Sequence, residues 1–132
     1  MAGRPASLAI ILGPALLLAL GSLAALVWLP HPVPKTATPP QRAYLTHCAS
    51  CHGADGRGSW RATLFLIRPG DLTDTSRMQA LTDEYLVGLV KHGGAPIGKP
   101  GMPAFGFHLD DEQIRELIAY LRAFPGRAPA RR

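Results

Sequence analysis

The chain has 132 residues, of which 47% are hydrophobic, and a formal net charge of +5 at pH 7. This length allows one small domain and little else. Between residues 41 and 124, nine basic residues balance nine acidic ones, so the excess charge lies near the two ends of the chain. Nucleic-acid binding is not expected, because no basic stripe interleaved with aromatic residues is present.

The first 30 residues have the composition of a membrane anchor. Residues 6–29 carry no charged side chain. As a helix rising about 1.5 Å per residue, they would extend roughly 36 Å and cross a bilayer. A cleavable signal peptide would have a shorter apolar stretch, and although Ser22 to Ala24 form a possible cleavage site, the apolar residues continue to Leu29. We therefore predict an uncleaved transmembrane helix within residues 1–30, with Arg4 on the cytoplasmic side and the remaining chain on the far side.

A proline-rich linker follows this segment. Residues 30–40 contain five prolines, which favours an extended, semi-rigid spacer that reaches about 34 Å at most. The remaining residues divide into a domain at 41–124 and a basic tail at 125–132. A single hydrophobic core is marginal in a domain of this size, which often gains stability from a cofactor or a crosslink. We therefore expect a bound group in its centre.

The domain is predicted to be all-α, with three helices and no strand pattern of useful length. The first covers residues 41–48 and follows two prolines. The second covers residues 83–92, with Thr82 as its N-cap and Gly93 at its end. The third begins after Asp110, with Gln113 at the capping-box position. Its apolar side chains recur every three or four residues and form one stripe: Ile114, Leu117, Ile118, Leu121 and Phe124.

The stretch "HCASCHG" at residues 47–53 contains the only two cysteines of the chain. A disulfide between them would close a very small loop and would stabilise the fold little. A dithiol oxidoreductase would place such a pair in a βαβ unit, and structural zinc needs four suitably spaced ligands. The C-x-x-C-H pattern instead favours haem: two thiols one helical turn apart add to the vinyl groups, and the adjacent imidazole binds the iron. Cys48 and Cys51 are thus the predicted attachment residues, and His52 is the predicted axial ligand.

A second axial ligand is expected on the opposite face of the haem. Met102 lies in "GKPGMPAFG", a loop restricted by prolines, and its thioether is a soft ligand that suits low-spin iron. Met78 has neither a proline neighbour nor such a loop. His92 and His108 are weaker alternatives. We therefore predict that His52 and Met102 are the two metal ligands.

These motifs resemble those of the class I c-type cytochromes, in a small membrane-anchored bacterial form. The resemblance covers residues 41–124 and depends on "CASCHGADGRG", "LTDEYLVGLVKHGG", "GMPAFG" and "LDDEQIRELIAYLRAF". It implies the cytochrome c fold around one covalent haem. It also implies that Cys48 and Cys51 bind the haem, that His52 is the proximal ligand and that Met102 is the distal one.

The resemblance extends to residues around the haem. "RPGDLTD" is similar to the family's segment in which a proline carbonyl accepts a hydrogen bond from the proximal histidine. It implies that Pro69 bonds to His52 and that Leu72 packs on the haem face, although Gly70 is an additional residue compared with the commoner order. It also implies that Tyr44 packs against the last helix. No role in this pattern can be assigned to Trp60.

The function implied is the transfer of single electrons, because iron with two protein ligands has no position for a small-molecule substrate. The protein would be a carrier rather than an enzyme, exchanging electrons with redox partner proteins at the periplasmic face of the bacterial inner membrane. The alternative is the haem c subunit of a larger membrane-bound oxidoreductase or of a respiratory or photosynthetic complex, which a short linker would suit. A haem-based sensor is disfavoured, because no signalling domain is present. A rim of basic side chains near the haem would face an acidic partner: Arg57, Arg61, Arg68, Lys91 and Lys99.

Overall fold

The computed structural model describes residues 5–124, apart from the side chains of residues 5–11 and 27–28. Arg4 and the predicted basic tail lie outside the described residues. The chain divides into two compact units, Met1–Pro30 and His31–Arg132. Its elements are helical, and no strand occurs within residues 5–124. The all-α prediction is confirmed.

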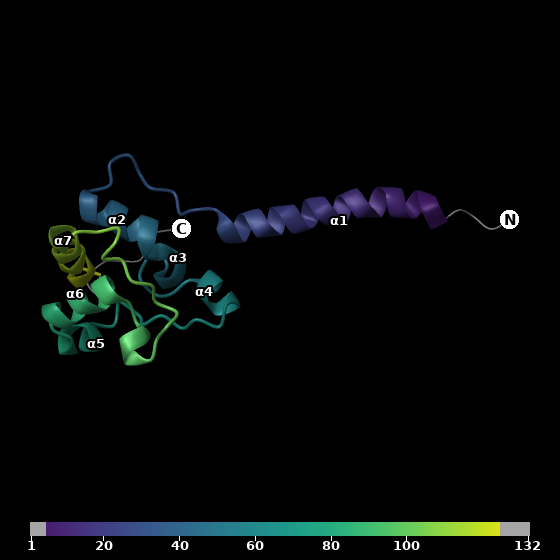
Figure 1. Ribbon diagram of the computed structural model, residues 1–132. Coiled ribbons are helices and arrows are strands. Elements are labelled where there is room, and N and C mark those ends of the chain that lie inside the picture. Colours follow the sequence, from purple (N-terminus) through teal and green to yellow (C-terminus); the bar gives the residue numbers. More distant parts are fainter. Residues whose placement is uncertain (1–4, 125–132) are drawn as a thin grey trace. The chain divides into compact units, whose positions relative to one another are not determined.

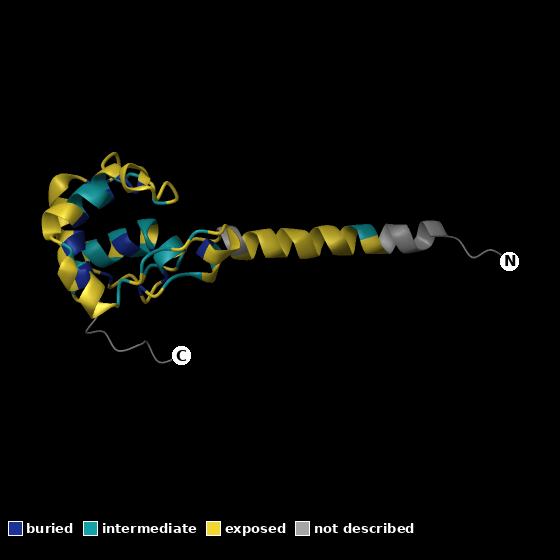
Figure 2. Ribbon diagram, turned by 90° about the horizontal axis from the view of Figure 1, so that it is seen from below, coloured by how far each residue is buried: buried dark blue, intermediate teal, exposed yellow. Residues whose placement is uncertain are grey.

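The described residues of the first unit form a single helix. Helix α1 (Pro5–Trp28) includes Pro14, and its described side chains are almost all exposed (Figures 1 and 2). No helix that the described residues form is both long enough and apolar enough to cross a membrane. The transmembrane helix therefore stays a prediction from the sequence.

Within residues 31–124, the second unit contains the three predicted helices together with four shorter ones. The predicted helices are α2 (Pro39–His47), α6 (Asp83–His92) and α7 (Asp111–Arg122). Helix α2 begins at Pro39, because proline is well suited to the first turn of a helix. The sequence did not predict α3 (Ala49–His52), α4 (Trp60–Leu64), α5 (Thr75–Ala80) and the 3₁₀ helix η1 (Ala95–Ile97).

The hydrophobic core forms where α7 packs against α2 and α6. The predicted stripe of α7 is buried along its length. From α2, the fully buried Tyr44 contacts two aromatic rings: its ring centroid lies 4.8 Å from that of Phe124 and 5.9 Å from that of Tyr120. The expected contact between Tyr44 and the last helix is confirmed. Figure 2 shows the buried residues of this unit in dark blue.

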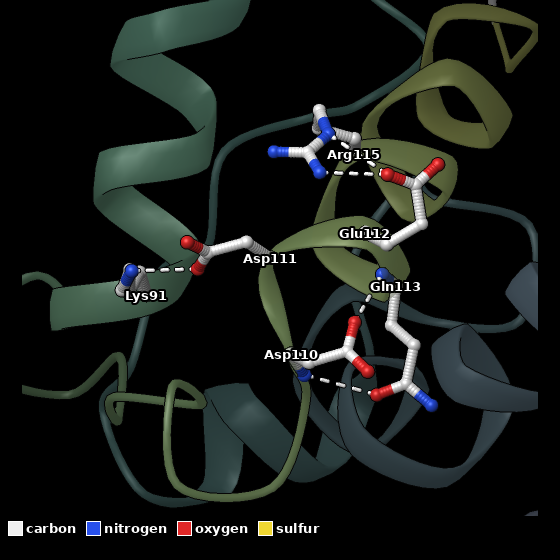
Figure 3. A network of polar contacts seen from close by, with 6 residues as sticks. All are labelled: Lys91, Asp110, Asp111, Glu112, Gln113 and Arg115. Atoms are coloured by element: carbon white, nitrogen blue, oxygen red, sulfur yellow. Dashed lines mark hydrogen bonds and ion pairs between the residues drawn. The ribbon is translucent and has the colours of Figure 1, made fainter.

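Two groups of polar contacts fix the start of α7 (Figure 3). The Asp110 carboxylate accepts a hydrogen bond from the Gln113 backbone N–H at 2.8 Å, and the Gln113 side chain accepts one from the Asp110 N–H at 2.9 Å. This is the predicted capping box, whose N-cap side chain typically contributes about 1 kcal/mol. The Lys91 ammonium at the end of α6 lies 2.6 Å from the Asp111 carboxylate, so α6 and α7 are joined beside the cap.

The end of α7 is held by Arg122. Its guanidinium lies 2.6 Å from the Asp83 carboxylate at the start of α6 and donates hydrogen bonds to the carbonyls of Met78 and Leu81. Met78 itself is buried in the core, with 3% of its surface exposed. The place of this methionine in the helix packing favours Met102 over Met78 as the predicted ligand.

Candidate haem-binding site

The two cysteines lie on a single helical turn. Cys48 joins α2 to α3, and its carbonyl accepts hydrogen bonds from the N–H groups of Cys51 at 3.2 Å and His52 at 2.9 Å. Helix α3 stops after His52 because Gly53 has a φ of 76°, which favours glycine. Both thiols are free and half-buried. This places the thiols one turn apart with the imidazole directly after them, as covalent haem attachment requires.

The chemistry of the thiols disfavours the alternatives. Burial, with a smaller contribution from Cys51, raises the pKa of the Cys48 thiol to about 12. At neutral pH it is therefore a neutral thiol, whereas the reactive cysteine of a dithiol oxidoreductase has a lowered pKa. The described residues contain no group of three or more His, Cys, Asp or Glu side chains that could hold a metal ion. A structural zinc site would need four ligands.

The imidazole of His52 is oriented by one hydrogen bond. Its Nδ1 lies 3.2 Å from the Gly70 carbonyl oxygen and donates to it, because a carbonyl can only accept. This leaves Nε2 for the iron. Burial lowers the pKa of His52, and the bond to Gly70 opposes this effect only in part. The neutral form that binds a metal is therefore favoured.

The prediction that Pro69 supplies this carbonyl was wrong by one residue. The additional residue, Gly70, carries the acceptor, while Pro69 lines a cavity beside it. The segment is fixed farther along the chain, where the Leu72 N–H donates to the Gly56 carbonyl at 2.8 Å. Leu72 is half-buried and packs against the core. Its contact with the haem face stays a prediction.

Met102 lies in a loop closed by its own backbone. Gly94 donates to the Met102 carbonyl, Met102 donates to the Lys99 carbonyl, and Lys99 donates to the Gly94 carbonyl, at 2.9, 3.1 and 2.9 Å. Gly93 has a φ of 76°, and a Cβ there would lie 2.8 Å from the Met102 oxygen. The glycines after α6 therefore allow the close approach of the methionine segment. Met102 is half-buried and packs against the core.

Further backbone bonds hold this loop on α6. The N–H groups of Phe105 and Gly106 donate to the carbonyls of Val90 and Lys91 at 3.0 and 3.1 Å. These carbonyls belong to the last turn of α6, where they have no partner within the helix. The position of the methionine loop is thus determined by the end of α6. The alternative ligands His92 and His108 are exposed.

A cavity of about 320 Å³ adjoins the acceptor segment of His52. Its lining includes the basic side chains of Arg57 and Arg68 and the half-exposed indole of Trp60. Neither of these two arginines forms an ion pair within the described part of the chain. A basic wall of this kind could receive the carboxylates of a haem. The sequence pattern gave no sign of the cavity, because its lining comes from α4 and from loops.

The residues present fit a covalently attached haem. They provide two thiols, a half-buried neutral imidazole with one nitrogen available, a soft thioether and a basic cavity. Large apolar side chains close to the motif are also exposed, with 59% of Leu64 and 55% of Phe65 accessible. Neighbouring exposed apolar side chains of this kind are typical of a binding surface.

Comparisons with known proteins agree with covalent haem attachment. The family model described as "Cytochrome C oxidase, cbb3-type, subunit III" matches residues 35–121, more than half of the chain. The gluconate 2-dehydrogenase cytochrome c subunit of Pantoea cypripedii is 29% identical over 85 residues. This match covers 60% of the present chain but only 18% of that subunit, so the chain spans less than a fifth of its length.

A solved structure supports the fold. The c-type cytochrome KustC0563 superimposes with a TM-score of 0.55 and 24% sequence identity, over 64% of the present chain and 95% of that protein. At this identity the likeness shows the fold alone. Together with the family match, it shows that the chain belongs to the family of the cbb3-type cytochrome c oxidase subunit III domain and is a class I c-type cytochrome that binds haem c covalently.

Proposed function

We propose that the chain carries single electrons between redox partner proteins, with Cys48 and Cys51 holding the haem and His52 and Met102 binding its iron. When bound, the haem supplies a one-electron couple of the iron. The observation that carries the proposal is the half-buried His52 imidazole, which follows directly after the two thiols and is fixed through Nδ1 on the Gly70 carbonyl. This arrangement presents Nε2 in a constant direction.

The residues of the site assist electron transfer without binding a substrate. His52 and Met102 would hold the iron and leave no position for a substrate. A thioether ligand would favour the reduced state and so raise the potential. The Met102 loop is held on the end of α6 by backbone hydrogen bonds, which would limit its movement and keep the reorganisation small. A small reorganisation is what a carrier needs.

A second candidate is that the chain is the haem c subunit of a larger oxidoreductase. The printed names of both the family and the Pantoea relative describe subunits. The linker at residues 31–40 also favours a subunit, because a short spacer confines the haem domain near the proposed membrane anchor, where a fixed partner would lie. Co-purification with a catalytic subunit in mild detergent would favour this candidate over the independent carrier.

We further propose that residues 1–30 anchor the chain in the bacterial inner membrane, with the haem domain in the periplasm. The support is the sequence: residues 6–29 have no charged side chain, and Arg4 precedes them. Extraction of the membrane fraction with alkaline carbonate tests the proposal. The anchored chain stays with the lipid at its uncleaved mass, whereas a cleaved or peripheral chain is released.

The proposed function itself is tested by optical spectroscopy. The protein is purified with its haem, and spectra are recorded oxidised, reduced, and reduced with carbon monoxide. We expect a c-type α-band that persists under denaturing conditions and that carbon monoxide leaves unchanged, because both axial positions are filled. Rapid carbon monoxide binding would contradict the closed site and would favour ligand binding or catalysis at the iron.

A further inference from the structure

The hydroxyl of Tyr44, a side chain of α2, reaches the haem-attachment turn. The residue is completely buried, and its hydroxyl donates to the Gly53 carbonyl at 2.6 Å. A buried hydroxyl is costly without a partner, and this partner is the residue directly after His52. The contact therefore joins the helix core to the backbone of the proximal ligand.

Gly53 is the point at which the chain reverses after α3. With its φ of 76°, it directs the backbone so that the Gly58 N–H donates to the His52 carbonyl at 2.7 Å. A Cβ on Gly53 would lie 2.7 Å from the Gly58 oxygen, so the turn has little space to shift. The backbone hydrogen bonds of His52 and Gly53 are local, because their partners lie in or beside α3 and in this turn. The Tyr44 hydroxyl supplies the link to a different helix.

The ring of Tyr44 fixes the hydroxyl in place. It packs on Phe124, and a Cβ on Gly56 in the same turn would lie 2.4 Å from Phe124. Tyr44 and Phe124 thus hold the turn of residues 53–58 between them. The orientation of His52 depends on this turn on one side and on its bond to Gly70 on the other.

We propose that Tyr44 is a positioning residue for His52, acting through its hydrogen bond to the Gly53 carbonyl to maintain the Nδ1 bond to Gly70 and so to set the reduction potential of the haem. The inference rests on the proposed function of His52 as the proximal ligand. The Nδ1 to oxygen distance of 3.2 Å is at the long end for such a bond, so a small rotation of the backbone weakens it. A weaker bond makes the imidazole less basic and favours reduced iron.

The experiment compares the haem-loaded full chain with its Tyr44→Phe variant, which retains the ring and removes the hydroxyl. We expect the midpoint potential to rise. We also expect the His52 Nδ1 proton, followed by NMR in the reduced state, to exchange about five to ten times faster, as the loss of one hydrogen bond implies. Tyr85→Phe is the matched control, because it removes a tyrosine hydroxyl from the partly exposed face of α6.

A second control separates positioning from stability. Ile118→Val removes one methyl group from the same core without altering any hydrogen bond, so it should lower the melting temperature and leave the potential and the exchange rate unchanged. If Tyr44→Phe lowers the melting temperature but leaves both the potential and the exchange rate at the wild-type values, Tyr44 has only a packing role and the proposal is overturned.

A measurement on the wild type covers the case in which Tyr44→Phe does not fold. In native-state exchange, the Tyr44 hydroxyl proton and the His52 Nδ1 proton should become exposed in the same opening event, with the same dependence on denaturant. Independent opening would refute the coupling. A wild type without a reversible one-electron couple would instead refute the proposed function.

Discussion

His47, the last residue of α2, stacks on His108 in the segment before α7, with ring centroids 5.9 Å apart and ring planes 21° apart. His47 also contacts Phe105, whose ring centroid is 5.7 Å away. The residue before the first attachment cysteine therefore lies against the chain that leaves the methionine loop. Two imidazoles this close make the contact sensitive to pH.

The first prediction concerns that sensitivity. Burial, and then repulsion from His108, lower the pKa of His47 below its unfolded value of about 6.5. At a pH between the folded-state pKa and the unfolded-state pKa, the unfolded chain binds more protons than the folded chain. His47 therefore lowers the free energy of unfolding as the pH falls below about 6.5. In urea titrations from pH 7 to pH 5, His47→Gln should show a smaller loss of unfolding free energy than the wild type. His92→Gln, on the exposed side of α6, is the control, and equal losses in wild type and His47→Gln would contradict the prediction.

The second prediction concerns the distal ligand. Met102→Ala should lose the weak near-infrared absorption that marks sulfur ligation and should lower the midpoint potential, because the thioether favours reduced iron. Met78→Leu replaces one core side chain with another of similar volume, so this variant should retain the near-infrared absorption and the midpoint potential of the wild type. A Met102→Ala protein with the wild-type spectrum would show that another residue binds the iron.

The third prediction concerns covalent attachment. Cys51→Ala should leave at most a single thioether bond through Cys48, and little protein should mature with haem. The covalent haem that remains after denaturation is measured by the pyridine spectrum and by mass. Ser50→Ala, at the exposed position between the cysteines, provides the comparison. Full covalent haem content in Cys51→Ala would exclude the attachment that we propose.

The fourth prediction concerns Gly56 in the turn after the motif. Its φ is 82°, and a Cβ there would lie 2.4 Å from Phe124 Cδ1, so Gly56→Ala should destabilise the fold by about 1–3 kcal/mol. Gly88→Ala is the matched control, because a Cβ there meets no atom within 4 Å and alanine favours the helix by about 1 kcal/mol. The midpoints of urea unfolding measure both changes. Similar midpoints for the two variants would disprove the steric argument.

The sequence predicts those features that depend on neighbouring residues. The capping box of Asp110 and Gln113 and the buried stripe of α7 follow from spacing alone, and the structure contains both. The motif at residues 47–53 likewise specifies the helical turn on which both thiols lie. Each of these features is determined within one or two helical turns.

Features that depend on distant parts of the chain were not predictable in the same way. The acceptor for His52 is 18 residues away, and a single additional residue moves the carbonyl from Pro69 to Gly70. Lys91, which was expected on a basic rim, forms an ion pair with Asp111. Its positive charge is therefore less available to an acidic partner than the sequence suggests. Helices α4 and α5 span five and six residues, too few for an apolar period to be evident.

The three backbone bonds among Gly94, Lys99 and Met102 form a closed cycle, in which each residue donates to another and accepts from the third. The length of this loop is consequently part of the ligand geometry, and an inserted or deleted residue between positions 94 and 102 would break at least one bond of the cycle. Residues 65–66, between α4 and the acceptor segment, form no such cycle: they are exposed, and their N–H groups donate only to carbonyls of α4 directly before them. Variation in chain length among relatives should therefore concentrate before the proximal acceptor and spare the methionine loop.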